Sequence, residues 1–160
     1  MTASNAHRYA TSLTWTGSTG AGYQAYDRAH AVTATPAEVS LELTSDPSFG
    51  GDATRLNPEQ LLVAAASSCQ LLSFLAVAAR ARLDVVGYAD EATAEMPTDN
   101  KPMWITRIDL RPVITITGDV SDDRLLHLVE IAHRECFIAS SLRTDVVVTP
   151  SFRRSRPPLA

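Results

Sequence analysis

Alternating apolar and polar positions mark the first third of the chain as β structure. One face of residues 9–15 carries the larger side chains Tyr9, Thr11, Leu13 and Trp15, which predicts a strand. Residues 23–32 are rich in β-favouring types and predict a second strand. Val39, Leu41 and Leu43 predict a third. Glycines at residues 17–22 and a proline at residue 36 separate them, so we expect an antiparallel meander.

A long apolar helix is predicted over residues 58–82. Asn57 is a good N-cap, Pro58 suits the first helical position, and Gln60 completes an Asn-x-x-Gln capping box. Apolar residues cover most of the circumference between residues 61 and 79. Three serines and Gln70 interrupt this stretch, which indicates a buried helix and not a membrane span. We expect a sheet and a partner chain to cover it.

The second half of the chain predicts a hairpin, a second helix and a last strand. The hairpin spans residues 86–96 and 104–116. Ser121 caps a helix that ends near Cys136, and residues 137–142 form a short turn or helix. Residues 145–150 predict the last strand, and residues 1–8 and 151–160 are expected to fray. The order βββ-α-ββ-α-β predicts an α+β fold with antiparallel sheet, in one domain over residues 1–160.

Composition narrows the class of protein. Of the 160 residues, 45% are apolar and 20% are charged, which is typical of a soluble globular chain. The net charge of −4 argues against a nucleic-acid or anionic-membrane surface. Two cysteines are too few for a disulfide scaffold, and the N-terminal residues show no signal-peptide pattern. We therefore expect a cytoplasmic protein.

The two cysteines, Cys69 and Cys136, decide the chemistry. They lie 67 residues apart, which fits no CxxC motif, so they could meet only through the fold. As core residues they would pack as small hydrophobes. A redox role needs a thiolate, and so a cation close to Cys69. Arg80 and Arg82 are about three turns away on the same helix, which leaves Arg28 on the second strand and Arg55 before the helix.

The spacing of two further groups of residues limits what they can do. His133 and Cys136 share a helical face with His127 two turns back, but a zinc site lacks a compact third and fourth ligand. Glu59 precedes Cys69 by ten residues, which is about 15 Å along a helix. Glu59 therefore cannot touch Cys69 of its own helix, and would serve a Cys69 site only from a second subunit.

Two motifs give the chain a family resemblance. Asn57-Pro-Glu-Gln-Leu-Leu-Val-Ala-Ala-Ala-Ser-Ser-Cys69 resembles the OsmC/Ohr family, the osmotically inducible protein C and organic hydroperoxide resistance proteins. Ala132-His-Arg-Glu-Cys136-Phe-Ile-Ala-Ser140, before a valine-rich strand, is the second match. Tyr23-x-x-Tyr26-x-Arg28-x-His30 with Asp52-Ala-Thr-Arg55 is similar to the broad OsmC-like group.

The resemblance implies an OsmC-like fold, with antiparallel sheets wrapped around a long central helix in an intertwined homodimer. It implies a cysteine-based peroxidase that reduces organic hydroperoxides in oxidative-stress defence. Cys69 matches the peroxidatic cysteine, Cys136 the resolving one, and Glu59 the glutamate that orients an arginine. The family places that arginine in the loop before the second strand, where this chain has Ser18, Thr19 and Gly20. Arg28, or alternatively Arg55, would take its place.

The implied mechanism runs through a Cys69 sulfenic acid and a Cys69–Cys136 disulfide. An external dithiol, for which a lipoyl-bearing protein is the candidate, would reopen the disulfide. No bound metal, flavin or haem is implied. The alternative is a non-catalytic OsmC-like dimer that binds a small apolar ligand at the subunit interface. A hotdog-type thioesterase, which also wraps a helix in sheet, fits the element order less well.

Overall fold

The computed structural model describes residues 6–155, which divide after Leu61 into two compact units. The first unit contains β1 (Ser12–Thr14), β2 (His30–Thr33) and β3 (Ser40–Leu43), paired antiparallel in that order, and a short 3-10 helix η1 (Pro47–Phe49). This confirms the predicted meander. The predicted frayed ends at residues 1–5 and 156–160 lie outside the described residues.

The second strand is shorter than the sequence predicts. β2 begins at His30, so the placement of Arg28 on this strand was wrong, and Arg28 lies in the loop before it. Its guanidinium accounts for this loop: Nη2 donates to the carbonyl of Tyr23 at 2.6 Å, and Nη1 to that of Tyr26 at 2.9 Å. Carbonyls that accept from a side chain leave the backbone of this segment in a loop and not in a ladder.

Helix α1 (Pro58–Arg80) begins where the capping box predicts. Asn57 Oδ1 accepts the Gln60 N–H at 2.8 Å, and Gln60 Oε1 accepts the Asn57 N–H at 3.1 Å. The helix ends two residues before the predicted Arg82. Arg82 has a φ of 57°, and the Leu83 N–H bonds to the Ala78 carbonyl, as in a Schellman motif.

The predicted hairpin forms, but each long strand is divided in two. β4 (Val85–Asp90) pairs antiparallel with β7 (Pro112–Ile116), and β5 (Thr93–Glu95) with β6 (Arg107–Leu110). Pro112 has no N–H to donate to a ladder, which favours a break between β6 and β7. At this break the Asp90 carboxylate accepts the Arg111 N–H at 2.7 Å.

Two helices and two strands complete the second unit. Helix α2 (Asp122–Arg134) is capped by Ser121 as predicted, and α3 (Phe137–Ser141) follows it. β8 (Asp145–Val148) pairs with β6, and β9 (Ser151–Arg154) pairs with β7. Both pairings are parallel, since the chain crosses over through α2 and α3, so the sheets are mixed and not wholly antiparallel.

The strand β9 corrects the prediction of a frayed tail over residues 151–154. β8 ends at Val148, and after Thr149 and Pro150 the chain pairs with β7, where Phe152 packs against the hydrophobic core. The observed order is βββ-α-ββββ-αα-ββ, and the predicted α+β class is confirmed.

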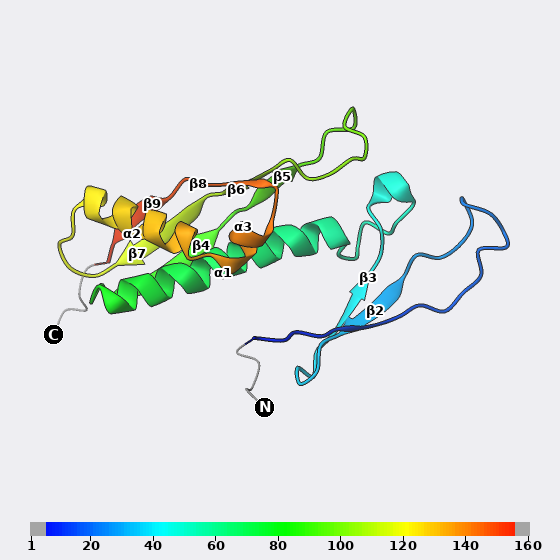
Figure 1. Ribbon diagram of the computed structural model, residues 1–160, viewed down its shortest axis with the longest axis horizontal. Helices are drawn as coiled ribbons and strands as arrows, with labels where there is room; N and C mark the ends of the chain where they lie inside the picture. Colours follow the sequence, from blue (N-terminus) through cyan, green and yellow to red (C-terminus); the bar gives the residue numbers. More distant parts are fainter. Residues whose placement is uncertain (1–5, 156–160) are drawn as a thin grey trace. The chain divides into compact units, whose positions relative to one another are not determined.

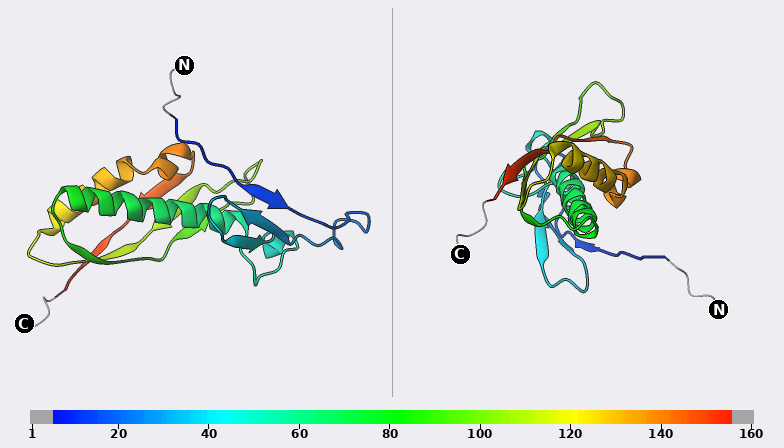
Figure 2. Two further views of the ribbon diagram at one scale, coloured as in Figure 1. Left: turned by 90° about the horizontal axis from the view of Figure 1, so that it is seen from below. Right: turned by 90° about the vertical axis from the view of Figure 1, so that its left-hand side faces the viewer.

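Within the second unit, α1 and α2 lie side by side over one face of the sheet formed by β4, β7 and β9 (Figures 1 and 2). They enclose a core that includes Phe74, Val77, Ile114, Leu125 and Ala132. A second core packs α1 against β6 and β8 through Ala66, Ile108, Leu110 and Val146. The two cores fix α1 to the sheet along much of its length.

Helix α1 is long and apolar enough to cross a membrane by length and composition alone. Its buried residues Phe74, Val77 and Ala78 belong to the core with the sheet and α2, and 28% of its apolar stretch is buried within the chain. Leu72 and Leu75 on the same helix are exposed by 63% and 38%. Part of the helix surface is therefore apolar and uncovered in the single chain.

Candidate active site

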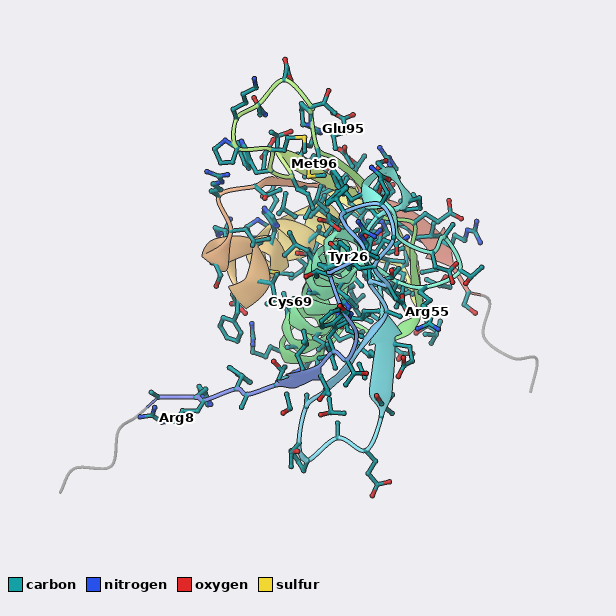
Figure 3. The ribbon with its side chains drawn as sticks, turned by 90° about the vertical axis from the view of Figure 1, so that its right-hand side faces the viewer. Arg8, Tyr26, Arg55, Cys69, Glu95 and Met96 are labelled. Atoms are coloured by element: carbon teal, nitrogen blue, oxygen red, sulfur yellow. The ribbon has the colours of Figure 1, made fainter. Side chains whose placement is uncertain are left out.

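The fold brings the two cysteine thiols together. Cys69 lies in the middle of α1, and Cys136 lies at the junction of α2 and α3 (Cys69 is labelled in Figure 3). The Cys136 thiol hydrogen-bonds to the Cys69 sulfur, and both are free cysteines. Cys136 is only 1% exposed, whereas Cys69 is partly accessible. The two cysteines are 67 residues apart in sequence, and the packing of α2 and α3 on α1 brings them together.

A ring of hydrogen-bond donors surrounds the Cys69 sulfur. Burial alone would raise the pKa of the Cys69 thiol, but donors from Ile138 N–H, the Cys136 thiol, Phe137 N–H and the Ser73 hydroxyl lower it below its ordinary value. The Ile138 N–H lies 3.5 Å from the sulfur. The Cys69 thiol is therefore the more readily ionised of the two.

The opposite holds for Cys136. Burial raises the pKa of the Cys136 thiol, and the neighbouring Cys69 raises it further, against the N–H groups of Ala139 and Ile138. Cys136 is thus the less readily ionised thiol. A more readily ionised thiol in contact with a less readily ionised one is the arrangement that a nucleophilic and a resolving cysteine require.

Cys69 opens into a hollow of about 510 Å³ in the second unit. Its walls combine apolar side chains with one ion pair: Leu72, Ser73, Ala76, Arg80, Glu135 and Phe137. Arg80 Nη2 lies 2.5 Å from Glu135 Oε2. Arg80 thus lines this hollow from the end of the helix, about three turns from Cys69, and is paired there with Glu135.

Arg28 and Glu59 line one hollow of about 420 Å³ in the first unit, together with Trp15, Tyr26, His30 and Phe49. The Arg28 guanidinium lies over the Tyr26 ring at 3.9 Å from its centroid, and over the Tyr23 ring at 4.9 Å. Two carbonyls and two aromatic faces fix this cation beside the wall that Glu59 contributes.

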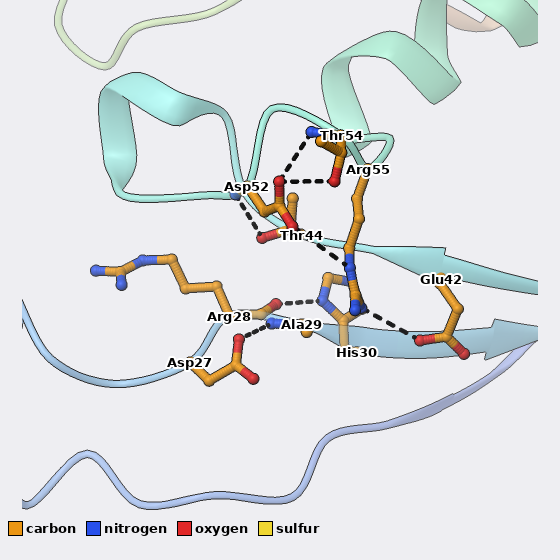
Figure 4. Close-up of polar contacts among 9 residues, drawn as sticks. All are labelled: Asp27, Arg28, Ala29, His30, Glu42, Thr44, Asp52, Thr54 and Arg55. Carbon is orange, nitrogen blue, oxygen red and sulfur yellow. Dashed lines mark hydrogen bonds and ion pairs between the residues drawn. The ribbon is translucent and has the colours of Figure 1, made fainter.

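Arg55 is engaged elsewhere. Its Nη1 lies 3.5 Å from Glu42 Oε2, and its Nε lies 3.8 Å from Asp52 Oδ2, so it belongs to an exposed ion-pair group (Figure 4). Arg28 is therefore the arginine that shares a hollow with Glu59. Because β2 begins only at His30, Arg28 lies in the loop before the second strand and not within it.

The histidines weighed as metal ligands do not gather. His127 Nδ1 lies 3.9 Å from Glu130 Oε2, and the buried His133 Nδ1 has no hydrogen-bond partner. Across residues 6–155, no group of three or more His, Cys, Asp or Glu side chains could hold a metal ion.

Sequence reasoning missed Ser73 and the N–H groups of Phe137 and Ile138. Ser73 follows Cys69 by four residues, so helical spacing alone could have identified it. The two N–H groups carry no such signal, because their place beside Cys69 depends on how α2 and α3 pack.

The chain was compared with known proteins. The family model described as OsmC-like protein matches residues 50–151. An OsmC-like protein of unknown function from Vibrio cholerae is 28% identical, with a TM-score of 0.81, 91% of this chain covered and 100% of that one. No curated protein matches the chain.

Two more distant structures share the fold. An organic hydroperoxide resistance protein from Legionella pneumophila is 19% identical, with a TM-score of 0.69, 91% of this chain covered and 96% of that one. The organic hydroperoxide resistance protein of Bacillus subtilis is 18% identical, with a TM-score of 0.60, 92% of this chain covered and 98% of that one.

Proposed function

Because the chain belongs to the OsmC-like protein family, we propose that it is a thiol-dependent peroxidase that reduces organic hydroperoxides to alcohols. The observation that carries the proposal is the contact between two thiols whose pKa values are displaced in opposite directions. Organic hydroperoxide resistance proteins of known structure share the fold and support this choice of substrate.

The first step is attack of the Cys69 thiolate on the distal oxygen of the hydroperoxide. The O–O bond breaks, Cys69 becomes a sulfenic acid, and the leaving alkoxide takes a proton to give the alcohol. In the second step the Cys136 thiol attacks the sulfenic sulfur, which forms the disulfide and releases water. The apolar side chains around Cys69, such as Leu72 and Phe137, favour an alkyl or acyl hydroperoxide over hydrogen peroxide.

The cation for Cys69 comes from a second subunit in this proposal. Ten residues separate Glu59 from Cys69 on α1, about 15 Å along the axis, so Glu59 does not reach the thiol of its own helix. Among residues 6–61 only Leu43, Thr44 and Asn57 are buried, which leaves this unit in need of a covering surface. A homodimer would provide that cover and bring Arg28 and Glu59 of one subunit to Cys69 of the other.

The cycle closes when an external dithiol exchanges with the disulfide and restores both thiols. The proposal requires no bound cofactor, with the protein acting in the reducing cytoplasm as part of oxidative-stress defence. A lipoyl-bearing protein is the candidate reductant, because its dithiol can open the disulfide and leave as a cyclic disulfide itself.

Thiol titration before and after one equivalent of cumene hydroperoxide tests the proposal. We expect the loss of both free thiols in the wild type. Cys69→Ser should abolish turnover, and Cys136→Ser should accumulate a sulfenic acid that dimedone labels. Retention of both thiols, with Cys69 unlabelled, would overturn the peroxidase and support a dimer that binds a small apolar ligand in the same hollow.

A further inference from the structure

An ion pair joins the end of α1 to the segment that carries the resolving cysteine. Arg80 is the last residue of α1, and Glu135, at the end of α2, directly precedes Cys136. Their side chains meet at 2.5 Å and line the Cys69 hollow. The peroxidase chemistry described above makes no use of this pair.

Few polar side-chain contacts hold the α2–α3 junction, although Ile138 and Ala139 of α3 pack against the second core. Cys136 is the N-cap of α3 but makes no side-chain capping bond, and α3 has only five residues. The Phe137 side chain is 80% exposed. The remaining polar contacts of the junction with α1 run through the Cys69 sulfur, a weak acceptor, with Ile138 N–H at 3.5 Å.

The position of this junction controls the fate of the Cys69 sulfenic acid. If Cys136 stays close, its thiol attacks the sulfenic sulfur and the disulfide forms with loss of water. If the junction opens, a second hydroperoxide can oxidise the sulfenic acid to sulfinic acid and leave as the alcohol. A dithiol reduces the disulfide but not the sulfinic acid. The first outcome therefore restores the Cys69 thiol, and the second loses it.

We propose that the Arg80–Glu135 ion pair holds the Cys136 segment against α1, speeds disulfide formation and thereby protects Cys69 from overoxidation. Arg80 and Glu135 are positioning residues in this scheme, since they act through Cys136 and touch neither reacting sulfur. The inference rests on the proposed peroxidase activity and deepens it.

The two oxidation steps can be timed separately in Arg80→Gln and Glu135→Gln. Rapid quenching with dimedone followed by intact mass measurement gives the rates of sulfenic acid and disulfide formation. We expect disulfide formation to slow roughly two- to fivefold relative to sulfenic acid formation in the same variant, the range of exposed ion-pair couplings. The sulfinic acid fraction should rise at high cumene hydroperoxide concentration.

Two controls separate positioning from a general loss of structure. Arg154→Gln breaks a comparable exposed ion pair, with Asp122, and should leave both rates unchanged. The exchanged pair Arg80→Glu with Glu135→Arg should recover the rate of disulfide formation. Salt at about 1 M, where the Debye length is about 3 Å, should slow this step in the wild type but not in Arg80→Gln.

Wild-type disulfide formation in both single variants, or no recovery in the exchanged pair, would overturn the inference. Failure of the peroxidase proposal looks different, because the wild type itself would then keep both thiols with cumene hydroperoxide. In that case diamide, which oxidises dithiols directly, tests the role of the Arg80–Glu135 ion pair by itself. Slower formation of the Cys69–Cys136 disulfide in the variants than in the wild type supports that role, and equal rates refute it.

Discussion

At the scale of single residues, two cysteines of one chain acquire different reactivity from what surrounds them. Cys69 receives hydrogen bonds from two backbone N–H groups, a hydroxyl and a thiol, and these outweigh the effect of its burial. Cys136 is more deeply buried and faces the sulfur of Cys69. Donors that stabilise a thiolate lower its pKa, and burial raises it, so position alone separates nucleophile from resolving thiol.

The Ser73 hydroxyl should affect how the rate of sulfenic acid formation at Cys69 depends on pH. Cys69 reacts as the thiolate, so sulfenic acid formation should rise with pH and level off above the lowered pKa of Cys69. Ser73→Ala removes one donor, moves that profile to higher pH and slows the step at pH 7 by roughly two- to tenfold, as for a hydrogen bond of about 0.5–1.5 kcal/mol.

Stopped-flow pH profiles with cumene hydroperoxide would measure the change. Ser68→Ala is the matched control, since Ser68 is an exposed serine of the same helix and should leave the profile in place. An unchanged profile in Ser73→Ala would show that this hydroxyl does not stabilise the thiolate.

A substitution at Gly50 tests whether the position of the Arg28 guanidinium matters for activity. Gly50 has a φ of 81°, and a Cβ there would lie 3.1 Å from Cζ of Arg28. Gly50→Ala should lose about 1 kcal/mol of stability from the left-handed backbone and also displace the guanidinium. A misplaced positioning group can cost up to about 100-fold in rate, so we expect peroxidase activity to fall roughly tenfold or more.

Gly118 provides a matched control for this prediction. It has the same φ of 81°, but nothing lies within 4 Å of the Cβ it would gain. Gly118→Ala should therefore lose similar stability in thermal unfolding and keep its activity. Equal activity in the two variants would remove Arg28 from the mechanism.

Sequence reasoning identified Cys69, Cys136, Arg28 and Glu59 as candidates. The structure brings the two cysteines into contact and places Arg28 and Glu59 in the lining of one hollow. The choice between Arg28 and Arg55 could not be made from sequence, because it depends on which carbonyls, rings and carboxylates surround each guanidinium. Ion pairs with Glu42 and Asp52 occupy Arg55, whereas the carbonyls of the Tyr23–Tyr26 loop hold Arg28 beside Glu59.

At the scale of elements, local signals predicted where helices begin better than where strands end. The capping residues Asn57 and Ser121 mark the starts of α1 and α2, since a cap is a bond between neighbours in sequence. Strand β9 was missed because its support comes from a distant strand: Phe152 pairs with Ile114 of β7. The division of the hairpin before β7, by contrast, could have been read from Pro112, which has no N–H to donate to a ladder.

The capping box of α1 can be tested by its reciprocal bonds. Asn57→Ala removes the acceptor for the Gln60 N–H, and the loss of such a cap costs about 1 kcal/mol. A loss of about 1 kcal/mol lowers the Tm of a chain of this size by roughly 2–4 °C, which is the fall we expect. Asn57→Ser keeps an oxygen that can cap and should unfold close to the wild type in calorimetry. Equal Tm values for the two variants would contradict a role for the cap.

At the scale of the whole molecule, each catalytic site of the proposed dimer takes groups from both subunits. Cys69 and Cys136 meet within one chain, whereas Arg28 and Glu59 would act on the thiol of the other subunit. A two-fold symmetric dimer would then contain two mixed sites. The sharing has a measurable consequence, because two inactive variants can restore each other.

Arg28→Gln and Cys69→Ser should each be inactive alone but active when mixed and allowed to exchange subunits. Random exchange gives half mixed dimers, and each holds one intact site, so we expect about a quarter of wild-type turnover with cumene hydroperoxide. Mixing Cys69→Ser with Cys136→Ser should restore nothing, because these two cysteines must come from one chain. If the first mixture also stays inactive while mass measurements show exchanged dimers, Arg28 does not act across the interface, and the cation for Cys69 must come from its own chain.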